Sequence, residues 1–177
     1  MNRNTEIKAR IGDMDSFRAL VESLADGEGQ VLIQEDVFFA CKTGRLKLRI
    51  FPDGQGELIA YQRPDHAGPK QSSYVIARTS EPDTLREALT SALGVLGIVS
   101  KTRLLYKIGQ TRVHLDTVED LGDFLELEVV LRPDQTEKDG LAIANRLIDL
   151  LHLRKDDLIS GAYIDLLTGH HTPSSIQ

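Results

Sequence analysis

Charged residues alternate with apolar ones in five short segments of this chain. The segments are Glu6–Arg10, Arg45–Arg49, Lys101–Arg103, His114–Asp116 and Glu126–Glu128. A period of two places successive side chains on opposite faces of a β-strand, so each segment has an ionic face and an apolar face. Guanidinium and ammonium groups bind phosphate oxygens, and carboxylates bind hard divalent cations. The spacing therefore indicates either ordinary solvent-facing strands or the lining of a polar interior that binds a highly charged ligand.

The signs of the charges differ from strand to strand. Arg45, Lys47 and Arg49 are all basic, whereas Glu126 and Glu128 are both acidic. Like charges two residues apart repel, and opposite charges or a ligand on neighbouring strands relieve that repulsion. Phe124 lies in phase with the two glutamates. This grouping favours an enclosed ionic face, although an antiparallel sheet with one wet side also shows such alternation.

The overall composition limits the classes of function. The chain has 177 residues, 41% hydrophobic and 27% charged, which predicts one soluble domain. A formal net charge of −6 argues against a nucleic-acid-binding surface and leaves a small, dense anion as the better partner for the basic strands. The sequence has no apolar run of membrane-spanning length and no signal-peptide pattern, so we expect no membrane partner and a cytoplasmic protein. The single cysteine, Cys41, excludes an internal disulfide.

The periodicity of the chain predicts eight strands and three or four helices. Strands are expected at about 5–11, 31–40, 45–51, 57–63, 71–78, 98–107, 110–118 and 124–132, and helices at about 14–25, 82–93 and 137–151. A short element is expected near 158–167. Hairpin connections dominate, so we predict an α+β fold with a mostly antiparallel sheet. If the eight strands curl into a barrel with the helices packed outside, the ionic faces point inward.

Several of these segments resemble one family in order along the chain. Residues 4–10, Asn-Thr-Glu-Ile-Lys-Ala-Arg, resemble the N-terminal Glu-x-Glu-x-Lys signature of the CYTH superfamily of triphosphate tunnel metalloenzymes. The likeness continues through residues 44–49, 61–65, 101–103, 114–119, 124–128 and 161–167 and is strongest to class IV adenylyl cyclase-like proteins. It implies an eight-stranded antiparallel tunnel, with one domain over residues 1–167 and a polar tail over 168–177.

The resemblance also implies a role for each matching residue. Catalytic positions are Glu6, Lys8, Glu126 and Glu128; triphosphate-binding positions are Lys8, Arg45, Lys47, Arg49, Arg63, Lys101, Arg103 and Tyr163; and positions for Mg²⁺ or Mn²⁺ are Glu6, Asp116, Glu126 and Glu128. Asn4 departs from the signature, which has a glutamate there. Asparagine keeps a carbonyl ligand but lacks a negative charge, so this position bears on whether a second metal binds.

Three functions are compatible with these residues. The first is a metal-dependent triphosphatase acting on ATP, tripolyphosphate or thiamine triphosphate. The second is a class IV adenylyl cyclase that forms cyclic AMP and pyrophosphate from ATP. The third is a module that holds triphosphate or polyphosphate without turnover, for which the missing acid at Asn4 is the argument. Hydrolysis requires no base-recognition pocket and is our first expectation; the resemblance also allows a homodimer.

Overall fold

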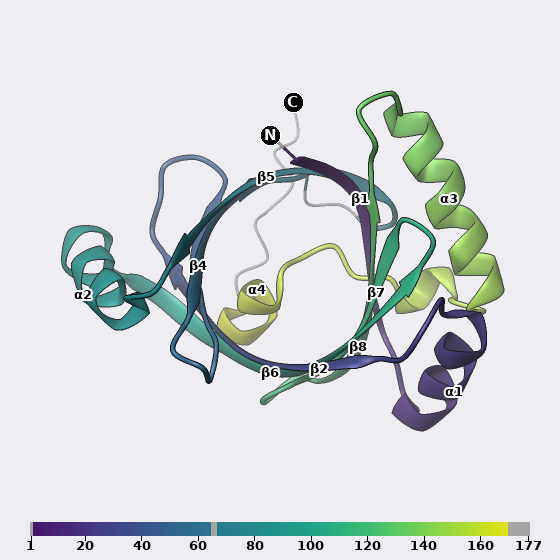
Figure 1. The fold of residues 1–177 in the computed structure, drawn as a ribbon, viewed down its shortest axis with the longest axis horizontal. Coiled ribbons are helices and arrows are strands. Elements are labelled where there is room, and N and C mark those ends of the chain that lie inside the picture. Colours follow the sequence, from purple (N-terminus) through teal and green to yellow (C-terminus); the bar gives the residue numbers. More distant parts are fainter. Residues whose placement is uncertain (1, 65–66, 170–177) are drawn as a thin grey trace.

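An antiparallel ring of strands dominates the computed structural model, which describes residues 2–64 and 67–169. The strands in this part of the chain are β1 (Asn2–Arg10), β2 (Gln30–Phe39), β3 (Arg45–Ile50), β4 (Gly56–Gln62), β5 (Lys70–Thr79), β6 (Val95–Ile108), β7 (Thr111–Val118) and β8 (Gly122–Val130). Their order is β1-β5-β4-β3-β2-β6-β7-β8, and β1 closes the ring by pairing with both β5 and β8 (Figure 1). The predicted antiparallel barrel and α+β class are confirmed. Of the predicted tail, all but Thr168 and Gly169 lies outside the described residues.

The alternation of residue types places one set of side chains outside the ring and the other inside. On β1, Ile7 and Ala9 are fully buried in the main apolar cluster together with Leu127 of β8. Glu6 and Lys8, in the opposite phase of β1, line a central cavity instead. Because a strand cannot present both sets on one face, the apolar phase fixes which face receives the helices.

Three helices cover the outer wall (Figure 1). Helices α1 (Met14–Leu24) and α3 (Glu137–Leu150) bury their apolar stripes against the outer faces of β1, β7 and β8, and α2 (Pro82–Leu93) packs on β2 and β3. Local signals start two of them: the Asp13 side chain accepts from the Ser16 amide, and Thr136 and Asp139 form a reciprocal capping box. Helix α3 approaches β1 so closely that a Cβ on Gly140 would collide with Thr5 Oγ1. None of the described helices is long and apolar enough to cross a membrane.

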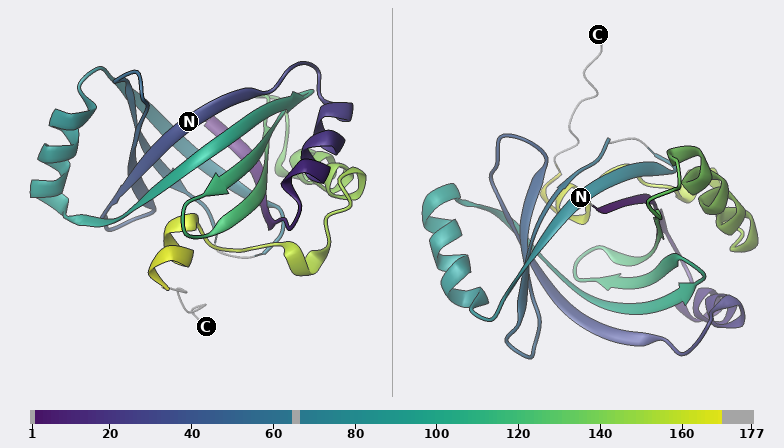
Figure 2. Two further views of the ribbon diagram at one scale, coloured as in Figure 1. Left: turned by 90° about the horizontal axis from the view of Figure 1, so that it is seen from below. Right: turned by 45° about the horizontal axis from the view of Figure 1, so that its top comes forward.

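Helix α4 (Tyr163–Thr168) does not follow the predicted arrangement of helices packed outside. It follows a short 3₁₀ turn, η1 (Lys155–Asp157), and lies across one end of the ring (Figures 1 and 2). At this end the inward side chains are apolar, and Phe38, Val99 and Phe124 pack with Tyr163 and Ile164. The helix therefore covers an apolar rim that would otherwise face solvent.

Candidate functional site

The interior of the ring encloses a cavity of about 290 Å³ that all eight strands and the start of α4 line. Its acidic residues are Glu6, Asp36, Glu57, Glu126 and Glu128, and its basic residues are Lys8, Lys47, Arg49, Arg63, Arg78, Lys101, Arg103 and Arg112. Among the described residues that line this cavity, basic side chains thus outnumber acidic ones by eight to five. We call this cavity the tunnel. A second hollow of about 510 Å³ is lined by residues of β2, β3, β6 and β7, and its charged side chains are Glu35, Lys101 and Glu119.

Three cations converge on one carboxylate on the β2–β3–β6 side of the tunnel. Asp36 is 2% exposed and accepts from Lys47 Nζ at 2.8 Å, Arg49 Nε at 2.8 Å and Lys101 Nζ at 2.6 Å. Burial opposes ionisation of Asp36, but the charges of Arg49, Lys101 and Lys47 prevail and hold its pKa well below its usual range. Burial, together with the nearby charges of Arg49 and Lys47, lowers the pKa of Lys101 to about 7 despite Asp36. We name these four residues the Asp36 cluster.

A second network ties β6 and β7 to α4. Arg103 donates to both oxygens of Asp116, from Nε at 2.7 Å and from Nη2 at 2.6 Å, and Nη2 also donates to Glu126 Oε2 at 2.8 Å. Tyr163 Oη donates to Asp116 Oδ2 at 2.8 Å. Burial raises the pKa of Asp116, but Arg103 outweighs that effect and the net shift is downward. Both oxygens of Asp116 are therefore engaged by protein groups.

The charged residues of β1 are held by partners on or beside nearby strands. Arg63 of the β4–β5 connection forms an ion pair with Glu6, and Lys8 Nζ lies 3.4 Å from Glu126 Oε1. Lys8 Nζ also lies 3.9 Å from the centre of the Tyr163 ring, in a cation–π contact. Burial raises the pKa of Glu6, and this effect exceeds the opposing influence of Arg63. Glu6 therefore holds a proton more readily than a free glutamate does.

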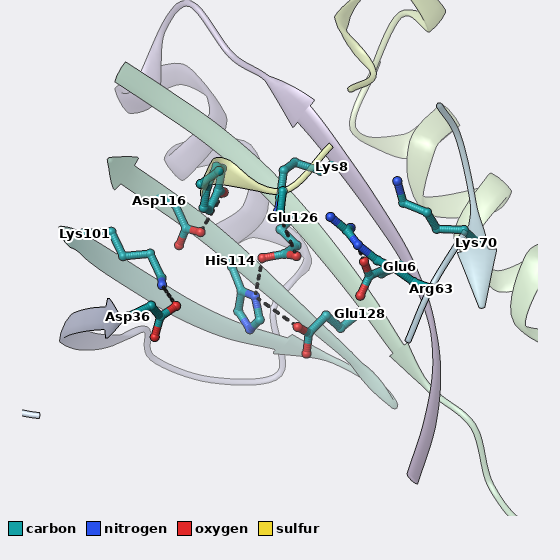
Figure 3. Close-up of polar contacts among 12 residues, drawn as sticks. Glu6, Lys8, Asp36, Arg63, Lys70, Lys101, His114, Asp116, Glu126 and Glu128 are labelled. Atoms are coloured by element: carbon teal, nitrogen blue, oxygen red, sulfur yellow. Dashed lines mark hydrogen bonds and ion pairs between the residues drawn. The ribbon is translucent and has the colours of Figure 1, made fainter. Parts of the chain in front are cut away.

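One group of side chains has the donors and spacing of a metal site. One ligand atom from each of His114, Glu126 and Glu128 lies within 4.8 Å of the others. His114 Nδ1 is buried without a hydrogen-bond partner among the described residues, and it lies 3.6 Å from Glu126 Oε2 and 4.0 Å from Glu128 Oε1 (Figure 3). Burial opposes ionisation of both glutamates, yet neighbouring positive groups lower the pKa of each. An unpartnered imidazole nitrogen beside two carboxylates suits a divalent cation. We call this group the His114 triad.

The structure brings most of the expected site residues together. Those that line the tunnel are Glu6, Lys8, Lys47, Arg49, Arg63, Lys101, Arg103, Glu126, Glu128 and Tyr163. Asp116 lies behind this lining under Arg103 and Tyr163. Arg45 lines a neighbouring pocket of about 480 Å³, where its Nη2 donates to Asp165 Oδ2 of α4 at 2.6 Å.

Several lining residues were absent from the predicted set, among them Asp36, Arg112 and Asn4. Arg112 Nη2 lies 2.6 Å from Glu128 Oε2, and Arg112 is in phase with His114 and Asp116 along β7. That phase was the signal that could have revealed it. Asn4, noted only as a departure from the signature, lines the tunnel with its Oδ1 buried and without a hydrogen-bond partner in the described part of the chain.

A comparison with known protein families assigns the chain to one of them. The CYTH domain family matches residues 2–163. The chain belongs to the CYTH family. This membership agrees with the signature resemblance at residues 4–10 and with the closed ring of eight strands. Among proteins with curated functions, none matches this CYTH domain.

Solved structures support the same fold. The PH1012 protein of Pyrococcus horikoshii OT3 has a TM-score of 0.82 at 24% identity, over 92% of this chain and 98% of that one. A Vibrio parahaemolyticus protein named for a proposed adenylate cyclase activity has a TM-score of 0.74 at 19% identity, over 93% and 97%. A Hippeastrum protein, also named for a proposed adenylyl cyclase activity and described as having a dominant triphosphatase activity, has a TM-score of 0.65 at 13% identity over 100% of both chains. At these identities the likeness establishes the CYTH tunnel fold and leaves activity open.

Proposed function

We propose that this CYTH domain binds a triphosphate in its tunnel and hydrolyses a phosphoanhydride bond with the help of a divalent cation. The observation that carries the proposal is the Asp36 cluster, in which the cations of Lys47, Arg49 and Lys101 share one buried carboxylate in a chain whose net charge is −6. Placing unbalanced positive charge inside a protein is unfavourable unless an anion compensates for it. A triphosphate supplies several negative charges in a small volume.

We assign phosphate binding to the basic residues of the Asp36 cluster and to Arg103. Lys47, Arg49 and Lys101 share one carboxylate, so two positive charges remain available on that side when all three are protonated. Guanidinium groups form paired hydrogen bonds to phosphate oxygens, and ammonium groups act as point charges. Catalysis of phosphoryl transfer is largely positioning and charge stabilisation, which this arrangement provides.

The His114 triad is the proposed metal site. Its unpartnered nitrogen and two ionised carboxylates fit Mn²⁺ or Mg²⁺, with His114 favouring Mn²⁺ because imidazole is a ligand for transition metals. A cation held there would neutralise phosphate charge and lower the pKa of an attacking water molecule. Asp116 was expected to be a metal ligand, but it lies outside the group that His114, Glu126 and Glu128 form, and both of its oxygens accept hydrogen bonds from Arg103 or Tyr163. We therefore assign it to positioning Arg103.

Glu6 is the proposed general base. Burial raises its pKa, which brings its proton affinity closer to that needed at neutral pH. Its carboxylate would remove a proton from the attacking water molecule, and Arg63 would stabilise the deprotonated form through their ion pair. Lys8, fixed between Glu126 and the Tyr163 ring, contributes a further positive charge to the phosphates.

The test uses purified protein with Mn²⁺ or Mg²⁺ and, separately, tripolyphosphate, ATP and thiamine triphosphate. We expect orthophosphate release, and we expect Glu128→Gln to reduce it by at least about 100-fold, since loss of even a supporting residue at a metal site costs about 10- to 100-fold. Glu119→Gln is the matched control, because Glu119 lines the second hollow and is absent from the tunnel lining. Cyclic AMP with pyrophosphate would instead establish a cyclase, and tight binding without turnover would establish a holding module. No binding of any triphosphate would overturn the proposal.

A further inference from the structure

One wall of the tunnel differs from the ionic lining described above. Ile59 and Tyr61 of β4 and Tyr74 and Ile76 of β5 all line the cavity. In the strand register Ile59 lies opposite Ile76, and Tyr61 lies opposite Tyr74. Directly opposite residues on one face of an antiparallel pair are in contact range. These four residues therefore form one continuous patch, which we call the apolar wall.

The apolar wall leads toward the end of the tunnel away from α4. Ile59 is 7% exposed, whereas Ile76 is 40% exposed although its strand phase directs it inward. In the described part of the chain, Ile59, Tyr74 and Ile76 belong to none of the three apolar core clusters. Ile59 is thus packed within the wall, and the side chain of Ile76 leaves apolar surface available for a ligand.

Phosphate-binding groups lie beside this patch. Lys47 of β3 is directly opposite Ile59 in the register, and Arg49 is two residues further along the same face. Arg112 Nη2 also donates to the Tyr74 hydroxyl at 3.4 Å, which ties the tyrosine to the charged side of the tunnel. A ligand whose phosphates contact Lys47 and Arg49 would therefore present its next carbon-bearing group to the apolar wall.

We infer that the apolar wall binds the ring system of an organic triphosphate, such as the base and ribose of a nucleoside triphosphate. This inference rests on the proposed binding of a triphosphate in the tunnel and specifies its substrate class as organic. Inorganic tripolyphosphate has no carbon atoms to cover Ile59 and Ile76. Ring systems do, and contact with them removes apolar surface from water.

Methyl NMR tests the contact directly. Protein with ¹³C-labelled isoleucine δ1 methyls is titrated with tripolyphosphate and with β,γ-imido-ATP in the presence of Mg²⁺, and Ile59→Val and Ile76→Val identify the two signals. We expect nuclear Overhauser effects from adenine or ribose protons to the methyls of Ile59 and Ile76. A bound imido-ATP without such contacts, or a protein that binds tripolyphosphate but not imido-ATP, would overturn the inference.

A matched pair of variants on β5 tests the energetic consequence. Ile76→Ser should weaken imido-ATP binding about five- to tenfold and leave tripolyphosphate binding unchanged. Val75→Ser, which changes the neighbouring outward residue (51% exposed), should affect neither ligand. If Ile76→Ser weakened the binding of both ligands equally, the role of the apolar wall would be refuted, and the proposed triphosphate binding would stand. Failure of the unmodified protein to bind either ligand would refute the proposed function first.

Discussion

Lys101 lies where positive charge in the tunnel is most crowded. Its pKa is lowered to about 7 by burial and by the charges of Arg49 and Lys47, although Asp36 accepts from it at 2.6 Å. At pH 8 the free protein therefore holds Lys101 largely deprotonated, and a bound polyanion would raise its pKa by favouring the charged form. The affinity for triphosphate should consequently fall as pH rises through 7.

This linkage predicts proton uptake on binding. At pH 8 the binding enthalpy of tripolyphosphate should depend on the ionisation enthalpy of the buffer, and the unmodified protein should take up nearly one proton more than Lys101→Arg takes up with the same ligand. Arginine stays protonated at this pH, so the variant lacks the contribution of Lys101. Lys107→Arg, at an exposed position on the same strand, serves as the control. Undiminished uptake in Lys101→Arg would assign the proton to another group.

His114 supplies the nitrogen donor that distinguishes the proposed metal site from an all-carboxylate site. Its Nδ1 is buried without a partner among the described residues, 3.6 Å from Glu126 Oε2. We predict that His114→Asn weakens Mn²⁺ binding at least about tenfold and Mg²⁺ binding less, since imidazole favours transition metals.

Electron paramagnetic resonance provides a readout independent of activity. Mn²⁺ bound to the unmodified protein should show ¹⁴N modulation of its spin echo, and His114→Asn should remove it. His152→Asn is the control, at an exposed position with a φ of 54° that asparagine tolerates. Persistence of the nitrogen signal in His114→Asn would rule His114 out as a ligand.

At the scale of elements, α4 closes one end of the tunnel through two polar attachments. Arg45 of β3 binds Asp165, and Tyr163 binds Asp116 of β7. Asp165 also accepts from the Ala162 amide at 2.7 Å, so this side chain caps α4 as well as pairing with Arg45. We therefore propose that Arg45 attaches α4 to the ring, in place of the phosphate-binding role that the family resemblance implies.

Substitutions of two arginines of β3, Arg45 and Arg49, test attachment of α4 and phosphate binding separately. Arg45→Ala should cost about 1 kcal/mol of unfolding free energy, in keeping with a partly exposed ion pair, and change tripolyphosphate affinity less than about twofold. Arg49→Ala should weaken that affinity about ten- to 100-fold, since charged hydrogen bonds contribute about 1.5–3 kcal/mol. Urea unfolding and titration calorimetry measure the two effects. Equal losses of tripolyphosphate affinity in both variants would show that Arg45 binds phosphate as well.

At the scale of the whole molecule, the proposed binding of a triphosphate should make the occupied protein more stable than the empty one. A ligand at 100 times its dissociation constant adds about 2.7 kcal/mol to stability. For a chain of this length that corresponds to a rise in Tm of about 5–10 °C. Differential scanning calorimetry with tripolyphosphate, against sulfate at equal ionic strength, measures it. An equal rise with sulfate would indicate only a general anion effect.

Much of the architecture follows from the sequence through short-range geometry. A strand must place successive side chains on opposite faces, so the phase of Ile7 and Leu127 determined the outer wall and the phase of Glu6 and Glu126 determined the lining. The same reasoning grouped the basic residues of β3 and β6 inside the ring. Capping residues such as Asp13 marked a helix start, because their hydrogen bonds are local.

The tertiary structure decided which partners each inward side chain meets. Asp116 and His114 have the same phase on β7, yet Asp116 is occupied by Arg103 and Tyr163 while His114 faces Glu126 and Glu128. These contacts depend on the stagger between strands and on where α4 returns, which residue spacing within one strand does not encode. The sequence alone thus determined that charge would line an interior; the closed ring decided which of those charges bind each other and which remain for a ligand.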